Sequence, residues 1–552
     1  MDNLIEKLVI ELVSQDINNE RDFLKLKRRF SRESKVQFFT SDELLRAYHN
    51  LIANKTISRS KELERMLTLK STRSDSGIVV VSLLTKPYPC PGKCLYCPSQ
   101  ADVPKSYLSN EPAVMRAIMC KYDPFLQTIS RLKALDAVGH ATDKVNIRII
   151  GGTWSAYEKR YQTWFIKRIF EAANELSHDT GSLQGDSSHY ACQLRGTQSV
   201  HQDDRTRTLE VLQSINETAK HRIVEISVET RQDYIDEKEI KRLRMLGVTK
   251  VELGVQSIYD DVLEFNKRGN KDIDTINATK LLKDAGFKVS YQMMANLPGS
   301  DLKKDEEMFK ELFNNPNYKP DHMKIYPMAL VKESGAYQIY KEGKYKPYAK
   351  DELVLLLKKI KSRIPYYCRI ERVIRDIPAN SIVEGGAKVS NMRQIVLSEM
   401  ENEELKCNCI RCREVKSSFD IDEKYRVFRE DYEASGGHEV FLSIENEERS
   451  KLYCMIRLRI NSKKMNNIGV LNNAAIIREI HTYGPQVRIG GRNDNAAQHQ
   501  GFGKMLIREA EKISKDEFRV KKIAVIAGVG VRGYFRKLGY ELIDSYMVKG
   551  LS

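Results

Sequence analysis

Residues 77–100 have the sequence GIVVVSLLTKPYPCPGKCLYCPSQ, and no other stretch of the chain is as informative. Its first half is a run of β-branched and aliphatic residues, which is typical of a buried strand. The run leads directly into Cys90, Cys94 and Cys97, spaced C-x3-C-x2-C. Three thiolates this close can bind three irons of a 4Fe–4S cube and leave the fourth iron open to a ligand. The alternative is a structural zinc site, but zinc usually takes four ligands, and no second cysteine pair lies nearby.

Short apolar strands alternate with amphipathic helices from residue 77 to about residue 378. The predicted strands are IVVVSLL, VNIRIIGG, IVEISVET, KVELGVQS, VSYQMMANLPG, HMKIYPMAL and CRIERVI. The segments DEKEIKRLRMLG and TINATKLLKDAG have helical periodicity and end in glycine, a common C-terminal stop. Repeated βα units predict a parallel sheet, partly or fully closed into a barrel, whose chemistry lies at the carboxyl ends of the strands.

The chain of 552 residues is too long for a single core, and its composition predicts four segments. These are a basic helical segment (1–75), the barrel (76–395), a cysteine-rich linker (396–425) and a mixed α+β domain (426–552). In the last segment FLSIE, YCMIRLRI, AIIREIHTYG and KIAVIA are predicted strands, and GFGKMLIREAEKISK is a predicted helix. The polar stretch 177–207 is expected to be an inserted loop.

The net charge of +16 is concentrated near the N-terminus, where residues 21–73 hold fourteen Lys and Arg against six Asp and Glu. A basic helical segment attracts nucleic-acid phosphates, although an anionic membrane surface would attract it too, and many charge runs are only solvated helix faces. We favour nucleic acid. The expected contacts are Lys27, Arg28, Arg29, Arg32 and Lys35.

Most of the ten cysteines fall into two tight groups, which favours metal ligation in a reducing cytosol over a disulfide framework. The second group, Cys407, Cys409 and Cys412, predicts a structural zinc site. Its fourth ligand is open among Cys368, His438 and Cys454, and three unliganded thiols are the alternative. No signal peptide or membrane-spanning run is found, so we expect a cytoplasmic protein without a membrane partner.

Polar and glycine residues follow the predicted strands of the barrel. Gly151, Gly152 and Thr153 end the second strand, where free backbone groups can hold the amino group of S-adenosylmethionine (SAM); a plain strand-to-helix turn is the alternative. Glu229 and Arg231 follow the third strand, and Gln256 ends the fourth. Such side chains can bind ribose or carboxylate, although salt bridges at the barrel rim would use the same residue types.

The sequence QHQGFG begins the predicted helix of the last domain. It comprises Gln498, His499, Gln500, Gly501, Phe502 and Gly503. Successive backbone N–H groups at a helix N-terminus favour an anion such as the pyrophosphate of coenzyme A. Tyr534, further along, is spaced to lie beside a thioester arm.

Together these motifs identify a resemblance. The segments that carry it are KPYPCPGKCLYCP, EPAVMRAIMCKYDP, IIGGTW, ISVETRQDY, VELGVQSIYDD, RVIRDIPA, DYEASGGHEVFLSIE, REIHTYG, QHQGFG and YFRKLGYE. From about residue 76 to the C-terminus the chain resembles the Elongator protein 3 family, in the stand-alone form of archaea and some bacteria. The resemblance implies a radical-SAM barrel joined through a metal-binding linker to a GNAT acetyltransferase domain.

The resemblance also implies a function. Cys90, Cys94 and Cys97 would hold a 4Fe–4S cluster that cleaves SAM, and the resulting radical would act on acetyl-CoA bound at 498–503 and Tyr534. The product would be 5-carboxymethyluridine at the wobble position of tRNA, gripped by the basic N-terminal segment. An electron donor is implied as a further partner, and the oligomeric state is open, a homodimer being one alternative.

One departure from the family bears on the catalytic residue. The family often has two adjacent tyrosines where this chain has Tyr534 and Phe535, so Tyr534 alone is expected to act. The main alternative function is a protein lysine acetyltransferase with the barrel as scaffold, for which Glu479 or His481 in REIHTYG would be the base. A non-catalytic tRNA-binding platform is a second alternative.

Overall fold

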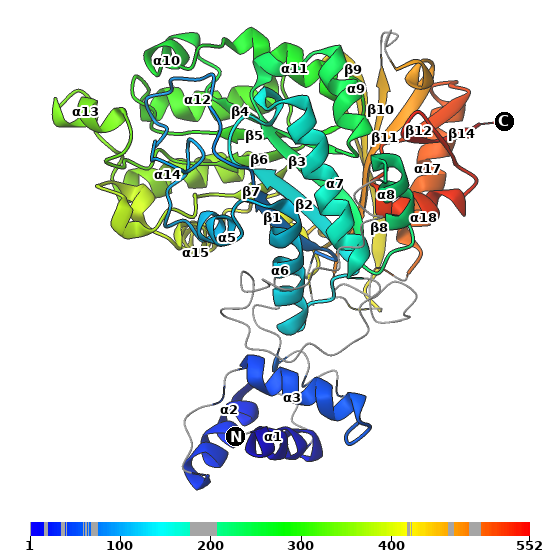
Figure 1. Ribbon diagram of the computed structural model, residues 1–552. Coiled ribbons are helices and arrows are strands. Elements are labelled where there is room, and N and C mark those ends of the chain that lie inside the picture. Colours follow the sequence, from blue (N-terminus) through cyan, green and yellow to red (C-terminus); the bar gives the residue numbers. More distant parts are fainter. Residues whose placement is uncertain are drawn as a thin grey trace.

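The computed structural model describes residues 2–15, 20–34, 39, 41–58, 60, 63, 66–67, 76–176, 207–416, 420, 422–461, 468–484, 498 and 500–551. The described elements form three groups, which are an N-terminal helical group, a parallel sheet surrounded by helices, and a C-terminal mixed sheet (Figure 1). The predicted loop at 177–207 lies almost entirely outside the described residues.

Three helices near the N-terminus enclose a small apolar core of their own. They are α1 (Asp2–Ser14), α2 (Glu20–Glu33) and α3 (Ser41–Ala53). Leu8, Leu26, Leu44 and Tyr48 belong to this core, which is separate from the main one. Figure 1 shows the three helices in dark blue below the barrel, and α3 contacts α6 (Pro124–Ala137).

The seven predicted barrel strands are confirmed. They are β1 (Val79–Leu84), β2 (Lys144–Ile150), β3 (Arg222–Thr230), β4 (Lys250–Gln256), β5 (Lys288–Met293), β6 (His322–Ile325) and β7 (Arg369–Arg372). Neighbours pair in parallel in chain order, and within the described residues β1 and β7 do not pair. The barrel is therefore partial, one of the two forms that the sequence allowed.

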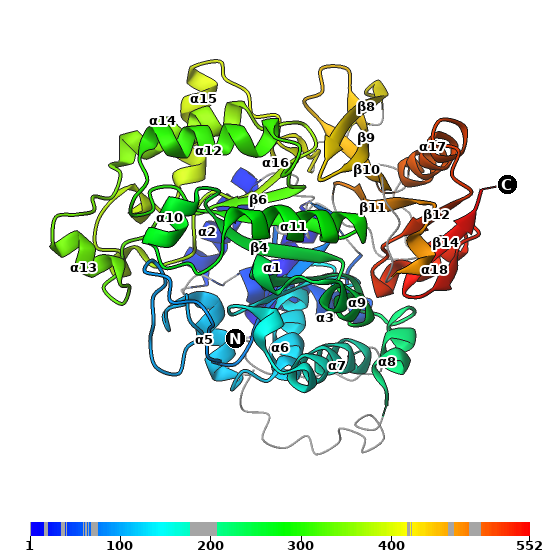
Figure 2. The same ribbon diagram turned by 90° about the horizontal axis from the view of Figure 1, so that it is seen from above.

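Helices cover the outside of this sheet, as Figures 1 and 2 show. They are α6, α7 (Lys159–Glu175), α8 (Leu209–Asn216), α9 (Glu237–Met245), α11 (Asp272–Asp284), α12 (Leu302–Asn314) and α14 (Lys350–Ser362). Gly247 and Gly286 follow α9 and α11 with φ +86° each, so the predicted glycine stops are confirmed. Further helices are α5 (Pro112–Met119), α10 (Asp260–Phe265), α13 (Ala336–Lys341), α15 (Met392–Asn402), α16 (Ile410–Arg413) and α18 (Arg532–Arg536).

The C-terminal sheet has the order β13-β14-β12-β11-β10-β9-β8. Its strands are β8 (Tyr425–Ala434), β9 (Gly437–Asn446), β10 (Leu452–Asn461), β11 (Ala474–Thr482), β12 (Lys522–Val525), β13 (Glu541–Ile543) and β14 (Tyr546–Gly550). α17 (Phe502–Asp516) packs on β10 and β11. β11 and β12 pair in parallel only up to Ile477 and Val525, beyond which β11 continues to Thr482 paired with β10.

Four strands of this sheet were predicted, whereas β8, β13 and β14 were not. β8 is an edge strand with mostly exposed side chains, so it lacks the apolar run that marks a buried strand. It joins β9 through a two-residue turn at Ser435 and Gly436, whose φ angles of 50° and 71° are typical of a tight hairpin. β13 is short and exposed.

The C-terminal sheet covers the amino ends of the barrel strands. Gly528 lies so close to β3 that a Cβ atom there would be 1.9 Å from the carbonyl oxygen of Val224. At the start of β6, Nε2 of His322 lies 3.3 Å from a carboxylate oxygen of Glu479 in β11. Within the described part of the chain, no helix is both long and apolar enough to span a membrane.

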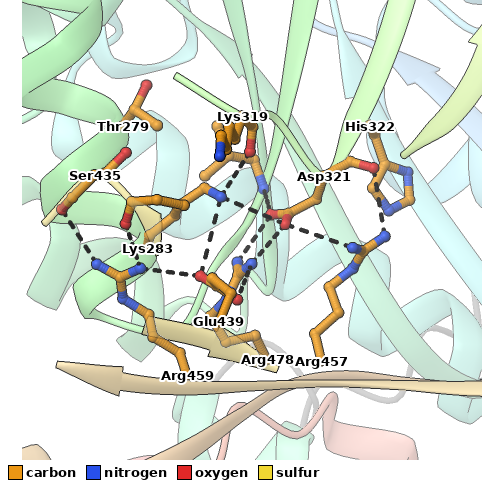
Figure 3. Close-up of polar contacts among 12 residues, drawn as sticks. Thr279, Lys283, Lys319, Asp321, His322, Ser435, Glu439, Arg457, Arg459 and Arg478 are labelled. Atoms are coloured by element: carbon orange, nitrogen blue, oxygen red, sulfur yellow. Dashed lines mark hydrogen bonds and ion pairs between the residues drawn. The ribbon is translucent and has the colours of Figure 1, made fainter. Parts of the chain in front are cut away.

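A buried network of ion pairs joins the two sheets at this junction (Figure 3). Arg478 of β11 donates to Asp321 at 2.5 Å and to Glu439 of β9 at 2.9 Å. Lys283 of α11 lies 3.7 Å from Asp321, and Arg459 donates to Glu439 at 3.0 Å. Burial alone would raise the pKa of Asp321, but the charges of Arg478, Lys283 and Arg457 outweigh it and hold that pKa well below its usual range. The junction is thus held together by opposite charges away from water.

Candidate functional site

The first cysteine group lies in the loop that follows β1. An ideal Cβ atom on Gly92 would lie 3.3 Å from Sγ of Cys94 and 3.8 Å from Sγ of Cys90, so both sulfurs face this glycine. The backbone N–H of Cys97 donates to the carbonyl oxygen of Cys94 at 3.3 Å, and the side chain of Cys97 is close enough to shift the pKa of Cys94. The three side chains therefore converge as predicted, at the carboxyl end of the barrel.

The spacing and charge of these thiols fit a cluster better than a single ion. Among the described residues, the only group of metal-ligand atoms that all lie within 4.8 Å of one another is the second group of cysteines. Each cysteine of a cube binds a different iron, so a wider spacing is expected for a cluster. The hydrogen bond from Cys97 and the charge of Arg268 lower the pKa of Cys94 to about 4 against the effect of burial. Thiolate is the form that binds metal.

Arg268 was not predicted, although it lies against the cysteine loop. Its Nη1 is 3.6 Å from Sγ of Cys94, and its Nη2 donates to the carbonyl oxygen of Gly254 at 2.6 Å. Its own carbonyl accepts from Arg231 at 2.8 Å, and Arg231 also donates twice to Asp233. Arg231 is thus held at the rim of the barrel, beside the cysteine loop. A single arginine after a short helix matches no known motif, so the sequence did not indicate that Arg268 contacts the cysteine loop.

The predicted glycine turn after β2 has the geometry of an open backbone. Gly151 and Gly152 have φ angles of +123° and +116°, which disfavour any other residue. A Cβ atom on Gly151 would lie 2.3 Å from Oγ1 of Thr85, whereas one on Gly152 would meet no atom within 4 Å. Gly151 therefore packs against the end of β1, and Gly152 leaves its backbone accessible to a ligand.

The interior of the barrel is lined by paired charges. Arg148 of β2 bridges Glu252 of β4 at 3.2 Å and Glu371 of β7 at 3.0 Å, and Lys324 of β6 pairs with Glu252. Glu229 accepts from Tyr107 at 3.0 Å, from Gln292 at 2.8 Å and from Lys324 at 3.3 Å. The sequence pattern that predicts this charged interior is the alternation of charged with apolar residues in the strands, because alternate side chains of a strand point to the same face of the sheet.

A cavity of about 830 Å³ passes along this lining from the cysteine loop to β11. Gln256, whose φ of +69° is unusual for a side-chain-bearing residue, lines it near the loop. Glu479, His481 and Tyr483 line it at β11. The carboxyl mouth of the barrel is therefore connected through its interior to the C-terminal sheet.

Glu479 and His481 are both held in structural contacts. Glu479 accepts from Arg457 at 2.8 Å and lies 3.3 Å from His322. Although burial opposes it, the charges of His322, Lys288 and Arg457 keep the pKa of Glu479 well below its usual range, which makes it a weak base. Burial lowers the pKa of His481, whose Nε2 lies 2.7 Å from the carbonyl oxygen of Ser76. A base role for either residue stays a prediction, and these contacts favour a structural role for Glu479.

The opposite face of β11 contacts the glycine-rich start of α17. An ideal Cβ atom on Gly503 would lie 3.3 Å from the hydroxyl of Tyr534, 3.7 Å from Ile480 and 3.8 Å from Thr482. Gly501 is left-handed with φ +76°. Tyr534 is 37% exposed, and burial together with Cys454 raises its pKa to about 12. The two predicted parts of the acetyl-CoA site thus lie side by side.

Two other residues of QHQGFG, Gln498 and Phe502, have side chains that contact the rest of the protein. Gln498 accepts from Lys144 of β2 at 2.9 Å and donates to the carbonyl oxygen of Thr482 at 3.4 Å, so it links the barrel to the end of β11. Phe502 is buried against Tyr425, which leaves only its backbone for a ligand. Gln500 precedes the helix, and His499 lies outside the described residues.

Comparisons with known proteins agree with this architecture. The signature of the Radical SAM superfamily matches residues 88–312, and that of the Radical_SAM C-terminal domain matches residues 320–402. The "tRNA uridine(34) acetyltransferase" of Methanocaldococcus infernus is 43% identical over 90% of both chains. "Elongator complex protein 3" of Homo sapiens is 37% identical over 89% of this chain and 87% of its own length.

The chain belongs to the Elongator protein 3 family. A solved structure, the archaeal Methanocaldococcus infernus Elp3 with an N-terminal deletion (1–46), covers 86% of this chain and all of its own length. The two have a TM-score of 0.71 and 40% sequence identity. The family resemblance inferred from the motifs is therefore confirmed.

The second cysteine group of this Elongator protein 3 family member is compact. The ligand atoms of Cys407, Cys409 and Cys412 lie within 4.8 Å of one another, which suits a single zinc ion. Nζ of Lys361 lies 3.2 Å from Sγ of Cys407 and 3.7 Å from Sγ of Cys412.

None of the three proposed fourth ligands joins this group in the described part of the chain. His438 contacts Asp431 and Glu433, and Cys454 contacts Thr482. Cys368 is buried with its carbonyl bonded to Ile410. Zinc binding stays a prediction, with three sulfurs as its ligands.

The predicted tRNA contacts lie on α2. Arg28 and Arg32 are exposed, whereas Arg29 pairs with Glu11. Lys27 is half-buried, 6.0 Å from the centre of the Phe23 ring, and its pKa is lowered by burial. Lys35 lies outside the described residues. Arg28 and Arg32 are therefore the predicted residues best placed to meet a phosphate.

Proposed function

We propose that the chain modifies the wobble uridine of tRNA to 5-carboxymethyluridine, using acetyl-CoA and a radical derived from SAM. The observation that carries the proposal is the cavity through the barrel. At one end it meets three converging cysteines, and at the other it meets the strand whose far face contacts Gly503 and Tyr534. The substrate base is inferred from the two archaeal relatives, each of which is a tRNA uridine(34) acetyltransferase.

Each end of the cavity has a defined task in this proposal. Cys90, Cys94 and Cys97 would hold the cluster, and the open backbone at Gly152 would receive the amino group of SAM. When bound, the cluster supplies the electron that cleaves SAM into a radical able to take a hydrogen from the acetyl methyl group. The carbon radical would add to C5 of uridine, and the adduct radical would then lose its C5 proton to solvent and one electron, for which the oxidised cluster would be the acceptor. Hydrolysis of the thioester by water would release coenzyme A.

The protein side chains position and protect these groups. The N–H groups at the start of α17 would bind the pyrophosphate of coenzyme A, and Tyr534, protonated at neutral pH, would donate to the thioester. The paired charges of the barrel wall keep the cavity polar without leaving an unpaired charge at Glu252 or Glu371. Enclosure within the barrel would shield a radical from water.

The experiment that tests the proposal is nucleoside mass spectrometry. Unmodified tRNA is incubated with anaerobically reconstituted protein, SAM, acetyl-CoA and dithionite. We expect 5-carboxymethyluridine from the unaltered chain and from Cys120→Ala, a thiol outside both cysteine groups, but none from Cys94→Ala. Product from Cys94→Ala would exclude the radical mechanism. Acetylation of a lysine peptide with no change in tRNA would favour the acetyltransferase alternative.

A further inference from the structure

We propose that a groove on α7 docks a small acidic protein that carries one electron, and that a row of aromatic rings conducts this electron to the cysteine loop. The groove, called here the α7 groove, is lined by Asp123, Lys159, Arg160, Thr163, Trp164, Lys167, Arg168, Glu171 and Arg242. The aromatic row consists of Tyr88, Tyr157, Tyr161 and Trp164. This inference rests on the proposed function, because a cluster must first be reduced by one electron before it can cleave SAM.

The aromatic row is continuous from the cysteine loop to the surface. Tyr88 lies two residues before Cys90, and its ring stacks on Tyr157 with centroids 4.6 Å apart. Tyr157 stacks on Tyr161 at 5.1 Å, and Tyr161 contacts Trp164 at 5.5 Å. Trp164 is 40% exposed and lines the α7 groove. Four rings in contact thus connect the groove with the residues that precede the first cysteine.

The inner rings are held rigidly against this loop. The Tyr157 hydroxyl bonds with Oγ1 of Thr85 at 2.8 Å and donates to the carbonyl oxygen of Lys86 at 2.7 Å. The Tyr161 hydroxyl accepts from the backbone N–H of Lys86 at 3.0 Å, and Nζ of Lys86 lies 4.9 Å from the centre of its ring. Electron tunnelling weakens steeply with each gap in the path. Ordered rings in contact keep those gaps short.

The charge of the α7 groove fits an acidic partner. Five cations and two carboxylates line it, and Arg168 is already paired with Glu171. Within the described residues, no ion pair is formed by Lys159, Arg160 or Lys167. An unbalanced positive groove speeds the approach of an acidic protein and orients it. Trp164, which lines the groove, belongs to the residue types enriched where interfaces gain their binding energy.

A nucleic acid would also be attracted to cations beside an exposed tryptophan. The aromatic row distinguishes the two partners. A base that stacks on Trp164 gains nothing from the three rings behind it, whereas an electron that enters at Trp164 meets a path to the cysteine loop. In the proposed step the reduced carrier loses one electron and the cluster gains it. No bond forms or breaks, and no proton moves.

The docking surface is tested with a reduced acidic bacterial ferredoxin as the probe. The charge-reversal variant Arg160→Glu/Lys167→Glu is compared with Lys303→Glu/Lys350→Glu, which makes the same charge change on α12 and α14 outside the groove. We expect the groove variant to raise the Kd for ferredoxin about tenfold or more at low salt, and the control to leave it nearly unchanged. The difference should shrink at high salt because surface charges are screened.

The electron path is tested by following the bleaching of the reconstituted cluster in a stopped-flow instrument. At saturating ferredoxin, Trp164→Leu should slow the reduction several-fold, while Trp164→Phe, which keeps a ring, should retain most of the rate. Dithionite should reduce all variants equally, which also shows that they are folded and loaded.

Two results would overturn the inference. One is unchanged ferredoxin binding together with weakened tRNA binding in the groove variant, which would make the α7 groove a nucleic-acid surface. The other is a rate for Trp164→Leu equal to that of the unaltered chain. Failure of the proposed function is a separate outcome, since it would appear as no 5′-deoxyadenosine from the unaltered chain even with dithionite.

Discussion

At the scale of single residues, the cysteine loop depends on side chains that no motif marks. Arg268 places a positive charge 3.6 Å from Sγ of Cys94 and bonds the carbonyl oxygen of Gly254. Because a neighbouring cation stabilises thiolate, Arg268 favours the form of Cys94 that would bind iron in the proposed function. Residues that orient or tune metal ligands are often as necessary as the ligands themselves.

The first prediction concerns this arginine. Arg268→Met should weaken iron–sulfur assembly by about 10–100-fold, the range seen when a partner of a metal ligand is removed. The measurement is the iron and sulfide content after anaerobic reconstitution at limiting iron. Arg372→Met serves as the control, because Arg372 is a rim arginine that is paired with Asp376. Equal iron content in the two variants would contradict a specific role for Arg268.

The second prediction concerns Tyr534. Replacement by phenylalanine removes the hydroxyl that lies beside Gly503, so acetyl-CoA hydrolysis should fall by about 10²-fold or more, as expected for loss of a positioned proton donor. The rate is measured as coenzyme A release with tRNA present. Tyr540→Phe removes a phenol bonded to Glu511 in the same domain and should change the rate little. A similar loss in both variants would indicate a structural effect.

At the scale of secondary structure elements, the junction between the barrel and the C-terminal sheet depends on buried charge. β6 begins just after Asp321, and β11 contributes Arg478 from the other sheet. Buried pairs add little net stability when compared with apolar replacements, but removing one partner leaves an uncompensated charge. The network in Figure 3 therefore makes the relative position of the two sheets specific.

The third prediction tests this junction. Asp321→Asn should lower the free energy of unfolding by about 3–5 kcal/mol, since Arg478 and Arg457 lose a buried counter-charge. Chemical denaturation at neutral pH measures the change. Glu307→Gln, which breaks an exposed pair with Lys310, should cost less than about 1 kcal/mol.

The effect of Asp321 should also depend on pH. Its folded pKa lies well below the unfolded value of about 3.9, so its ionised form stabilises the folded state. This contribution is complete above about pH 4 and is lost as the pH falls further toward the folded pKa. The difference between Asp321→Asn and the unaltered chain should therefore be constant from neutral pH down to about pH 5 and shrink only in stronger acid.

The barrel strands could be predicted because their sequence pattern reflects how each strand is buried. The barrel strands are bounded by glycine and polar turns and carry apolar residues at alternate positions, so all seven could be located. The alternating partners of β2, β4, β6 and β7 are charged, which indicates a polar interior. β8 was not predicted, because an exposed edge strand lacks the run of apolar residues by which a buried strand is recognised in the sequence.

At the scale of the whole molecule, the cavity places the two ends of the proposed reaction on one axis. The cysteine loop lies at the carboxyl mouth of the barrel, and β11 closes the amino end. The N-terminal helices have a core of their own, so they can bind a partner without disturbing the barrel. In the proposed function, tRNA binding, radical formation and acetyl-CoA binding fall to three separate parts of the fold.

The fourth prediction tests the first of these parts. Arg28→Ala/Arg32→Ala removes two exposed cations from α2 and should weaken tRNA binding. It should also make the slope of log K against the logarithm of the salt concentration shallower by about 2. Lys303→Ala/Lys350→Ala, which removes two exposed lysines from the barrel, should leave the slope unchanged. Affinity is measured over a series of salt concentrations. An unchanged slope in the α2 variant would exclude phosphate contacts by these residues.

Local patterns were enough to predict the cysteine loop, the seven barrel strands and the glycine-rich start of α17. Each is encoded within a few neighbouring residues, since cysteine spacing, strand alternation and left-handed glycines act at short range. The folded chain alone showed that Arg268 lies on Cys94, that Tyr534 lies beside Gly503, and that Asp321 pairs with Arg478. These contacts join residues far apart in the chain. Their partners are selected by packing and charge compensation in the assembled fold, which no local pattern records.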